Sequence, residues 1–285
     1  MLCVRGLFIE CGSVKIPTGR ALRYNDTTMS WASRRRTVYS LGVFFFFAIV
    51  IGVPTAIWLY EPSTCFDGVQ NQGETAIDKS GPCLLLDERA LSPHAVLWSR
   101  AFLVRGGLYN AAAYIENPNR GAGVRSVGYR FGLYDERNIL VAERVGRTYV
   151  MPGAITPVFE GGINTGYRTV ARAYLEFTSP LVWERMTNTA SVLVISNKKI
   201  TNTDSTPRLT AEVTNTSVAV VRNPSFVAVV FDTASNAFAV SATTLPRLDD
   251  GQKEEVVFTW PDPYPRVVGR IDVLPILPPL LSPVK

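Results

Sequence analysis

The sequence predicts an all-β protein in which two tandem antiparallel β-sandwiches follow one N-terminal transmembrane helix. Residues 38–60 form an uncharged, apolar run. After residue 90, apolar residues alternate in short segments bounded by Gly, Pro, Asn and Asp, a pattern typical of antiparallel sandwiches. Two stretches of this region resemble each other at a distance of about 100 residues, which indicates two copies of one domain.

The apolar run at 38–60 is long enough for a membrane anchor, since as a helix it spans about 34 Å and a hydrocarbon core is roughly 30 Å thick. Basic residues precede it and aromatic residues close it: Arg34, Arg35, Arg36, Trp58 and Tyr60. Basic residues stay on the cytoplasmic side, so we expect a single-pass protein of the cell membrane with a cytoplasmic N-terminus and extracytoplasmic C-terminal domains. A cleaved secretory signal is the alternative, although its apolar run is usually only about 7–15 residues long.

The charge distribution argues against a nucleic-acid partner. The formal net charge is +5, and residues 1–60 account for all of it, with seven Lys or Arg against Glu10 and Asp26. Residues 61–285 are therefore neutral, and a nucleic-acid-binding surface would need a basic patch there. The excess of basic residues before the apolar run instead indicates the orientation of the helix in the membrane.

Residues 1–37 lack periodicity, and we expect a disordered cytoplasmic tail. Met29 lies just ahead of the arginines, so the sequence leaves open whether residues 1–28 are translated. Cys3 and Cys11 would stay reduced on this side of the membrane.

Residues 61–89 read as a linker closed by a disulfide. Cys65 and Cys83 lie in the compartment where thiols oxidise. A disulfide between them would stabilise the folded state by roughly 3 kcal/mol. The Cys-x-Asp-Gly spacing resembles a module found beside the membrane anchors of bacterial surface proteins. That resemblance implies oxygen ligands for Ca²⁺ at Asp67, Asn71, Glu74 and Asp78. Lys79 and Ser80 depart from the module, and a plain polar loop is the alternative.

The strand-like segments divide into a first sandwich at 90–185 and a second, with a Pro-rich tail, at 186–285. The expected strands are 107–116, 127–134, 139–144, 174–177, 191–196, 209–214, 226–232, 237–242, 255–260 and 270–274. In both halves a strand ends in an Asn-containing turn, and the next strand ends in an aromatic residue and Asp. These recurring positions are Asn117 and Asn215, then Asp135 and Asp232.

Residues 131–135, Phe-Gly-Leu-Tyr-Asp, resemble the signature of the FxLYD family of bacterial envelope proteins. The resemblance covers about 70 residues of the first half, and it implies an immunoglobulin-like fold at the cell surface with no catalytic residues. In the second half, only Asp232 of the motif is kept. From the residues alone, Phe131, Leu133 and, across the pleat, Tyr134 fill a strand, while Asp135 accepts hydrogen bonds from the turn that follows.

We find no group of residues that assembles a catalytic or metal site. His94 is the only histidine, and one imidazole without partners does not build a transition-metal site. Paired carboxylates at 249–250 and 254–255 fall in turn-like sequence, and Asn215-Thr-Ser217 is an N-glycosylation sequon.

Two features point instead to recognition of a partner. Arginines are frequent in the first half, with two tyrosines beside them, and binding surfaces favour both residue types: Arg120, Arg125, Arg130, Arg144, Arg147, Arg168, Arg172, Tyr149 and Tyr167. Polar strand faces give the same composition without any ligand. The extended tail at 275–283 either covers an edge of the second sandwich or serves as a partner peptide.

The sequence therefore predicts a non-enzymatic, membrane-anchored surface protein that acts in adhesion or as an accessory subunit of an envelope complex. We expect a protein partner and the lipid bilayer, and we expect no cofactor, small-molecule substrate or nucleic acid. A structural spacer that holds a partner off the membrane is the alternative, and an enzyme is a third.

Overall fold

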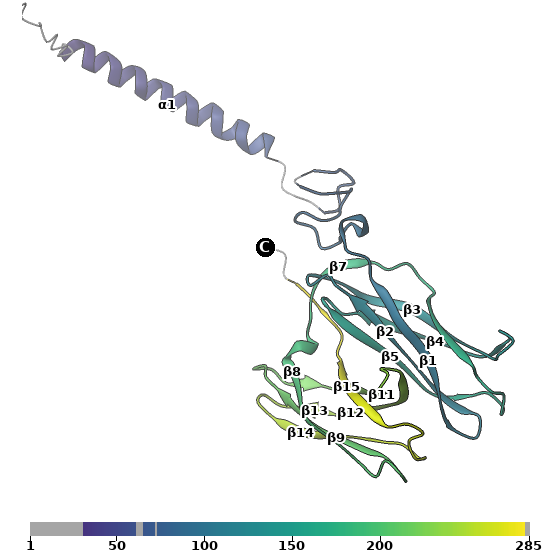
Figure 1. Cartoon of the computed structure of the whole chain (residues 1–285). Helices are drawn as coiled ribbons and strands as arrows, with labels where there is room; N and C mark the ends of the chain where they lie inside the picture. The colour runs from purple at the N-terminus through teal and green to yellow at the C-terminus, as the bar shows by residue number, and fades with distance from the viewer. Residues whose placement is uncertain (1–30, 61–64, 72, 283–285) are drawn as a thin grey trace, which may run out of the picture. The chain divides into compact units, whose positions relative to one another are not determined.

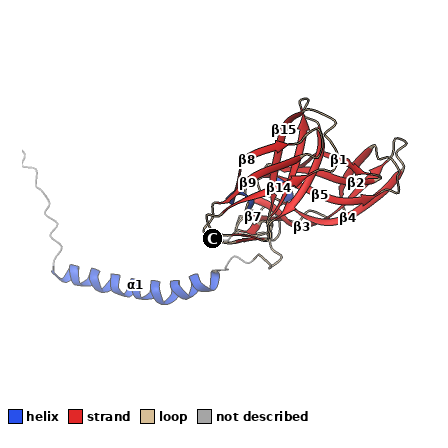
Figure 2. Cartoon of the chain, turned by 90° about the horizontal axis from the view of Figure 1, so that it is seen from below, coloured by secondary structure: helices blue, strands red, loops and turns tan. Residues whose placement is uncertain are grey.

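The computed structural model describes residues 31–60, 65–71 and 73–282. The chain divides into two compact units, residues 1–62 and 63–285, and Figure 1 traces both. The first unit contributes one helix and the second consists mainly of antiparallel strands (Figure 2). This confirms the prediction of a mostly β protein with one apolar helix near its N-terminus.

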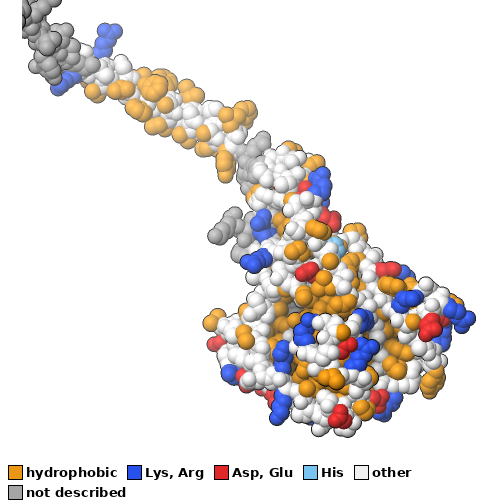
Figure 3. Space-filling model, in the orientation of Figure 1, with side chains coloured by type: hydrophobic (Ala, Val, Ile, Leu, Met, Phe, Trp, Pro, Cys, Tyr) orange, Lys and Arg blue, Asp and Glu red, His pale blue; other side chains and the backbone are white. Residues whose placement is uncertain are grey.

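The helix α1 spans Trp31–Leu59, so it begins seven residues earlier than predicted and includes Arg34, Arg35 and Arg36. Its length of about 43 Å and its apolar composition are sufficient to cross a membrane. Figure 3 shows hydrophobic side chains along the helix and basic side chains near the end that adjoins residues 1–30. The expected tail at 1–37 thus loses its last residues to the helix, and residues 1–30 lie outside the described part.

Pro54 lies within α1, where it has no N–H to donate to the preceding turn. The next residue, Thr55, donates its hydroxyl to the carbonyl of Ile51 over 2.6 Å. Thr37 makes the same kind of bond to Ser33, over 3.0 Å. Both hydroxyls are therefore satisfied within the helix.

The first half of the β unit contains two sheets. Its strands are β1 (Ala95–Arg105), β2 (Leu108–Asn117), β3 (Ala122–Tyr134), β4 (Leu140–Val150), β5 (Ala154–Asn164), β6 (Arg172–Phe177) and β7 (Trp183–Thr187). Sheet II has the order β1-β2-β5, and in sheet I β3 pairs with β4, β6 and β7. A short 3-10 turn, η1 (Glu88–Ala90), precedes β1.

The second half also contains two main sheets. After the 3-10 turn η2 (Ala190–Val192) come β8 (Leu193–Thr201), β9 (Arg208–Asn215), β10 (Val221–Arg222), β11 (Ser225–Asp232), β12 (Ala237–Thr244), β13 (Arg247–Leu248), β14 (Lys253–Thr259), β15 (Val268–Ile276) and β16 (Leu280–Leu281). Sheet III has the order β12-β11-β15, and sheet IV has the order β14-β9-β8. Each of the ten expected strands overlaps one of these strands or those of the first half.

The four sheets stack as I, II, III and IV, with three apolar layers between them. One layer joins sheets I and II, and another joins sheets III and IV. A third layer lies between sheets II and III, and its aromatic members include Phe102, Tyr114 and Phe231. The two halves therefore form one packed unit rather than two domains joined only by a linker.

The third layer explains the composition of the two central strands. In β2, Ala111, Ala113 and Ile115 face sheet I, whereas Ala112 and Tyr114 face sheet III. In β11, residues 226 and 228 face sheet IV, whereas residues 227, 229 and 231 face sheet II. A strand that is buried on both faces has no polar positions to alternate, so both strands read as continuous apolar runs.

Strand β7 joins the two halves and receives both ends of the β unit. On one side it pairs with β3, and on the other Arg185 N donates to the carbonyl of Leu84 and Arg185 O accepts from Ser282 N. Figure 1 shows the C-terminal segment running from β15 back towards β7. The tail therefore covers an edge, which was one of the two alternatives, but this edge belongs to the first half and not to the second. The expected boundary at 185/186 falls within β7.

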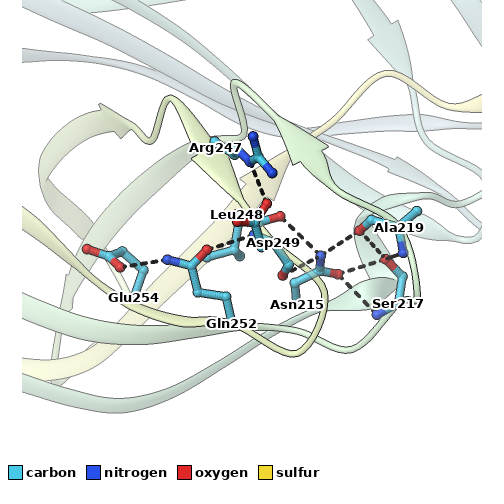
Figure 4. A network of polar contacts seen from close by, with 8 residues as sticks. All are labelled: Asn215, Ser217, Ala219, Arg247, Leu248, Asp249, Gln252 and Glu254. Atoms are coloured by element: carbon cyan, nitrogen blue, oxygen red, sulfur yellow. Dashed lines mark hydrogen bonds and ion pairs between the residues drawn. The ribbon is translucent and has the colours of Figure 1, made fainter.

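A buried asparagine closes each of the strands β2 and β9. Asn215 is fully buried, and its amide donates to the carbonyls of Ala219, Leu248 and Asp249 (Figure 4). Asn117 likewise donates to the carbonyls of Ala122 and Met151. Because its amide is shielded and engaged, Asn215 is unavailable as a glycosylation site in the folded protein, although the sequence there is a sequon.

Replacing Asn215 by Ala should lower the free energy of unfolding by roughly 3 kcal/mol, because one buried and two partly buried carbonyls lose their donor. Chemical denaturation of residues 63–285 measures this change. Asn164→Ala, at an exposed strand end, is the control and should cost under about 1 kcal/mol. Equal effects of the two substitutions would contradict a bracing role for Asn215.

Replacing Phe231 by Ala should cost about 3–5 kcal/mol, because the ring is 2% exposed and fills the layer between sheets II and III. Tyr167→Ala is the control, since that ring is 85% exposed. Thermal unfolding followed by circular dichroism compares the two variants. A Phe231→Ala protein as stable as the control would mean that the layer does not hold the halves together.

Candidate functional site

A groove of about 750 Å³ opens on the side of the stack where sheets I, II and III present their edges. Four runs of consecutive residues line it: 99–104 in β1, 171–174 at the start of β6, 237–241 in β12, and 259–266 after β14, together with Asn110. Both halves of the β unit thus contribute walls, so the groove exists only because the halves pack against each other.

The lining shows that strand edges face the groove. Successive side chains of a strand point to opposite faces, so a run of six consecutive residues lines a space only where the strand turns its edge to it. Strand β1 is the outer strand of sheet II, and β12 is the outer strand of sheet III. Alternate backbone N–H and C=O groups of an outer strand have no partner in their own sheet.

The edge of β12 is partly closed by side chains. Trp260 Nε1 donates to Val240 O over 3.1 Å, and Arg100 donates to Ala237 O over 3.0 Å. No such bond reaches the backbone of residues 95–105 within the described part of the chain, apart from the pairing with β2. The edge of β1 is therefore the open one.

Aromatic and proline residues form the far wall. Tyr264 packs edge-on against Phe238 and Trp260, with ring centroids 5.2 and 5.4 Å apart. The loop is anchored where Trp260 N donates to Pro207 O and Tyr264 N donates to Thr203 O. On the opposite wall Tyr174 is half exposed and Leu103 is 63% exposed, so apolar surface remains open to solvent.

The groove carries a positive charge excess. Arg266 pairs with Asp232 at 2.7 Å, and Asp262 is neutralised by Arg105 at 2.8 Å. Arg100 and Arg172, in contrast, bond only neutral oxygens among the described residues, those of Ala237, Asn236 and Asn138. Two guanidinium groups are thus held in place without a carboxylate partner. The groove therefore offers a backbone edge, apolar side chains and fixed positive charge, which are means of recognition.

The five-residue motif lies next to this groove and has structural roles. Phe131 and Leu133 are fully buried in the layer between sheets I and II. Tyr134 lies across the pleat, over Gly132, where a side chain at position 132 would collide with the ring. Its ring packs against Tyr174, which lines the groove, at 5.6 Å.

Asp135 closes the turn after β3, as predicted. Its Oδ1 accepts from the N–H groups of Arg137 and Ile139, each over 2.9 Å. These hydrogen bonds, above all the one from Ile139, lower the pKa of the carboxyl, and Arg168 acts in the same direction. Asp232 repeats the arrangement with Ala234, Asn236 and Arg266, and its pKa is also lowered.

The predicted disulfide between Cys65 and Cys83 is confirmed, with 5.4 Å between the two Cα atoms. Glu74 is buried beside it and accepts hydrogen bonds from the N–H groups of Asn71 and Asp78. Among the described residues, the cluster suited to a metal combines Glu74 with these two cysteines, whose sulfurs are bonded to each other.

The other candidate calcium ligands hold the loop together. Asp67 accepts from Val69 N and from the amide of Asn71, and Asp78 accepts from Gly68 N. Their carboxylates therefore bond backbone and side-chain donors within the loop, as the polar-loop alternative expects.

The five residues predicted to anchor the chain in the membrane lie on or beside α1. Arg34, Arg35 and Arg36 are in its first two turns, Trp58 is in its last turn, and Tyr60 follows the helix; all five are exposed. Arg35 lies 3.9 Å from the ring of Trp31.

The arginines of the first half do not converge on one site. Arg125 pairs with Glu184, and Arg130 pairs with Glu143 and Glu176 on the outer face of sheet I. Arg147 bonds Ser126, and of the seven only Arg172 lines the groove. His94 packs between the rings of Phe177 and Trp183, at 5.9 and 5.7 Å.

Most of the groove is not apparent from the sequence. Strand β1 was not expected, because residues 95–105 show no clear alternation, although Ser92-Pro93 and Gly106-Gly107 flank them as turn signals. The repeated Trp-Pro and Tyr-Pro pairs at 260–265 were a usable signal for an ordered loop. The pairing of these segments in one groove depends on the packing of sheets II and III.

Comparisons with known proteins do not identify the chain. No protein-family model matches it, and no curated protein matches it in sequence. Similar solved structures include red sea bream transglutaminase, with a TM-score of 0.23 and 10% identity, covering 66% of this chain and 30% of that one. Another is a β-glucuronidase of glycoside hydrolase family 2, with a TM-score of 0.20 and 10% identity, covering 72% and 26%.

The lowered pKa values of Asp135 and Asp232 predict a specific acid sensitivity. Each carboxylate adds stability that is complete above its unfolded pKa, near 4, and is lost as the pH falls through the lower folded value. The double variant Asp135→Asn, Asp232→Asn should be less stable than the wild type at pH 7, and its stability should fall less below about pH 4. Denaturation midpoints from pH 7 to 2 test this.

Glu136→Gln is the control, because it removes a neighbouring exposed charge that makes no hydrogen bond in the described part of the chain. If the double variant lost stability at low pH as steeply as this control, the two carboxylates would not carry the acid sensitivity.

Proposed function

We propose that the protein is a membrane-anchored recognition protein whose β unit lies outside the cytoplasm and binds a protein partner through the groove. The observation that carries this proposal is the combination of an apolar helix long enough to span a bilayer with a separate β unit that presents an apolar, positively charged groove. Three arginines at the N-terminal end of the helix favour a cytoplasmic N-terminus.

The β unit on this proposal consists of two immunoglobulin-like sandwiches that arose from one domain. In both halves, equivalent strands have equivalent neighbours: β1-β2-β5 corresponds to β8-β9-β14, and β4-β3-β6 to β12-β11-β15. The buried asparagines and the turn-closing aspartates occupy corresponding places in the two halves. These correspondences support membership of the FxLYD group for the first half and a diverged copy in the second.

An adhesive or accessory role fits this arrangement better than catalysis or spacing. His94 is engaged by aromatic rings and lies outside the groove lining, whose one carboxylate, that of Asp262, is paired with Arg105. A spacer needs no open apolar groove, whereas a recognition protein does.

The topology is tested by protease treatment of spheroplasts that carry the full chain with an epitope tag at its N-terminus. The protease should remove residues 65–285 from intact spheroplasts and leave a tagged fragment that contains the helix. Lysed spheroplasts, in which the tag is also digested, are the control. If the β unit survived in intact spheroplasts and was digested only after lysis or in detergent, it would lie in the cytoplasm. That result would overturn the proposal.

A further inference from the structure

The open edge of β1 determines what the groove can hold. It is 11 residues long, has exposed Leu97 and Leu103, and ends beside the second half of the unit. Natural proteins usually shield such an edge with charges, proline or a covering segment, because an unpaired edge accepts another strand. Residues 99–104 of this edge line the groove, which corresponds to an extended partner segment of about six residues.

The charged side chains of the groove indicate the chemistry of the partner. Arg100, on β1 itself, and Arg172, at the start of β6, both line the groove, and neither has a carboxylate partner among the described residues. Carboxylates on the peptide would neutralise these two guanidinium groups, and such charge-assisted bonds are strong. Aliphatic or aromatic residues at alternate positions would face Leu103 and Tyr174.

Two segments of this chain are poor occupants. The C-terminal tail is already paired with β7 at Leu280–Leu281. Strand β1 of a second copy carries Arg100 and Arg105 and no acidic residue, so pairing two such edges would bring like charges together.

We infer that the groove binds an extended, acidic segment of another protein, which adds as a strand to the free edge of β1 and pairs its carboxylates with Arg100 and Arg172. This inference rests on the proposed recognition function and names the chemistry of its partner.

The test uses the full chain in phospholipid nanodiscs and a phage-displayed library of random ten-residue peptides. Selection should enrich peptides with Asp or Glu flanked by apolar residues at alternate positions. For a selected peptide, Arg100→Gln together with Arg172→Gln should weaken binding roughly tenfold or more. Arg222→Gln removes one exposed charge on β10, away from the lining, and should leave the affinity unchanged.

Hydrogen exchange gives a second readout that does not depend on substitutions. Outward-facing amides of residues 99–104 should exchange rapidly in the free protein and be protected by the peptide, while amides of the outer strand β4 should not change. Protection elsewhere, enrichment of peptides without carboxylates, or no enrichment at all would overturn the inference. Protection of β1 without peptide that rises with protein concentration would instead indicate pairing between two copies.

The result of the peptide experiments can be told apart from the result of the experiment that tests the proposed function. The protease experiment on spheroplasts reports the side of the membrane on which the β unit lies, and the peptide selection reports what the groove binds. An extracytoplasmic β unit whose groove selects no acidic peptide would leave the topology standing and remove the inferred ligand class.

Discussion

The apolar layer between sheets II and III is the contact on which the rest of the β unit depends. Trp98 packs against Tyr114 at 4.5 Å and against Phe231 at 6.2 Å, so side chains from both halves interlock there. Burial of large aromatic surface is the main favourable contribution to such packing. The same layer brings β1 and β12 to one side of the stack, and the groove is a direct consequence of their proximity.

Strand β7 reinforces this arrangement through the backbone. The chain enters the second half from β7, and its last described residues return to pair with the same strand, beside the segment at 84–86. Both ends of the second half are therefore fastened to one strand of the first half, which restricts hinge motion between the halves. The segment behind the disulfide is fixed to β7 as well, because Leu86 N donates to Trp183 O and Arg185 N donates to Leu84 O.

Local hydrogen bonding explains why some features were predictable from the sequence. Asp135 and Asp232 each bond N–H groups two and four residues ahead, and Asn117 and Asn215 each accept from the N–H two residues ahead. Such contacts depend on residues that are adjacent in the sequence. The recurrence of these residues in the two halves is consequently visible without any knowledge of the tertiary structure.

By itself, the sequence determined the apolar helix, the ten strands with clear turn signals and the disulfide pair, because hydrophobic run length, residue alternation and cysteine placement are local properties. Only the tertiary structure decided that β2 and β11 are buried on both faces, that the tail returns to β7, and that β1, β6, β12 and residues 259–266 surround one groove. These contacts join residues far apart in the sequence, such as Arg100 and Ala237, which are 137 positions apart. Their partners are chosen by the packing of whole sheets, which no short window of sequence encodes.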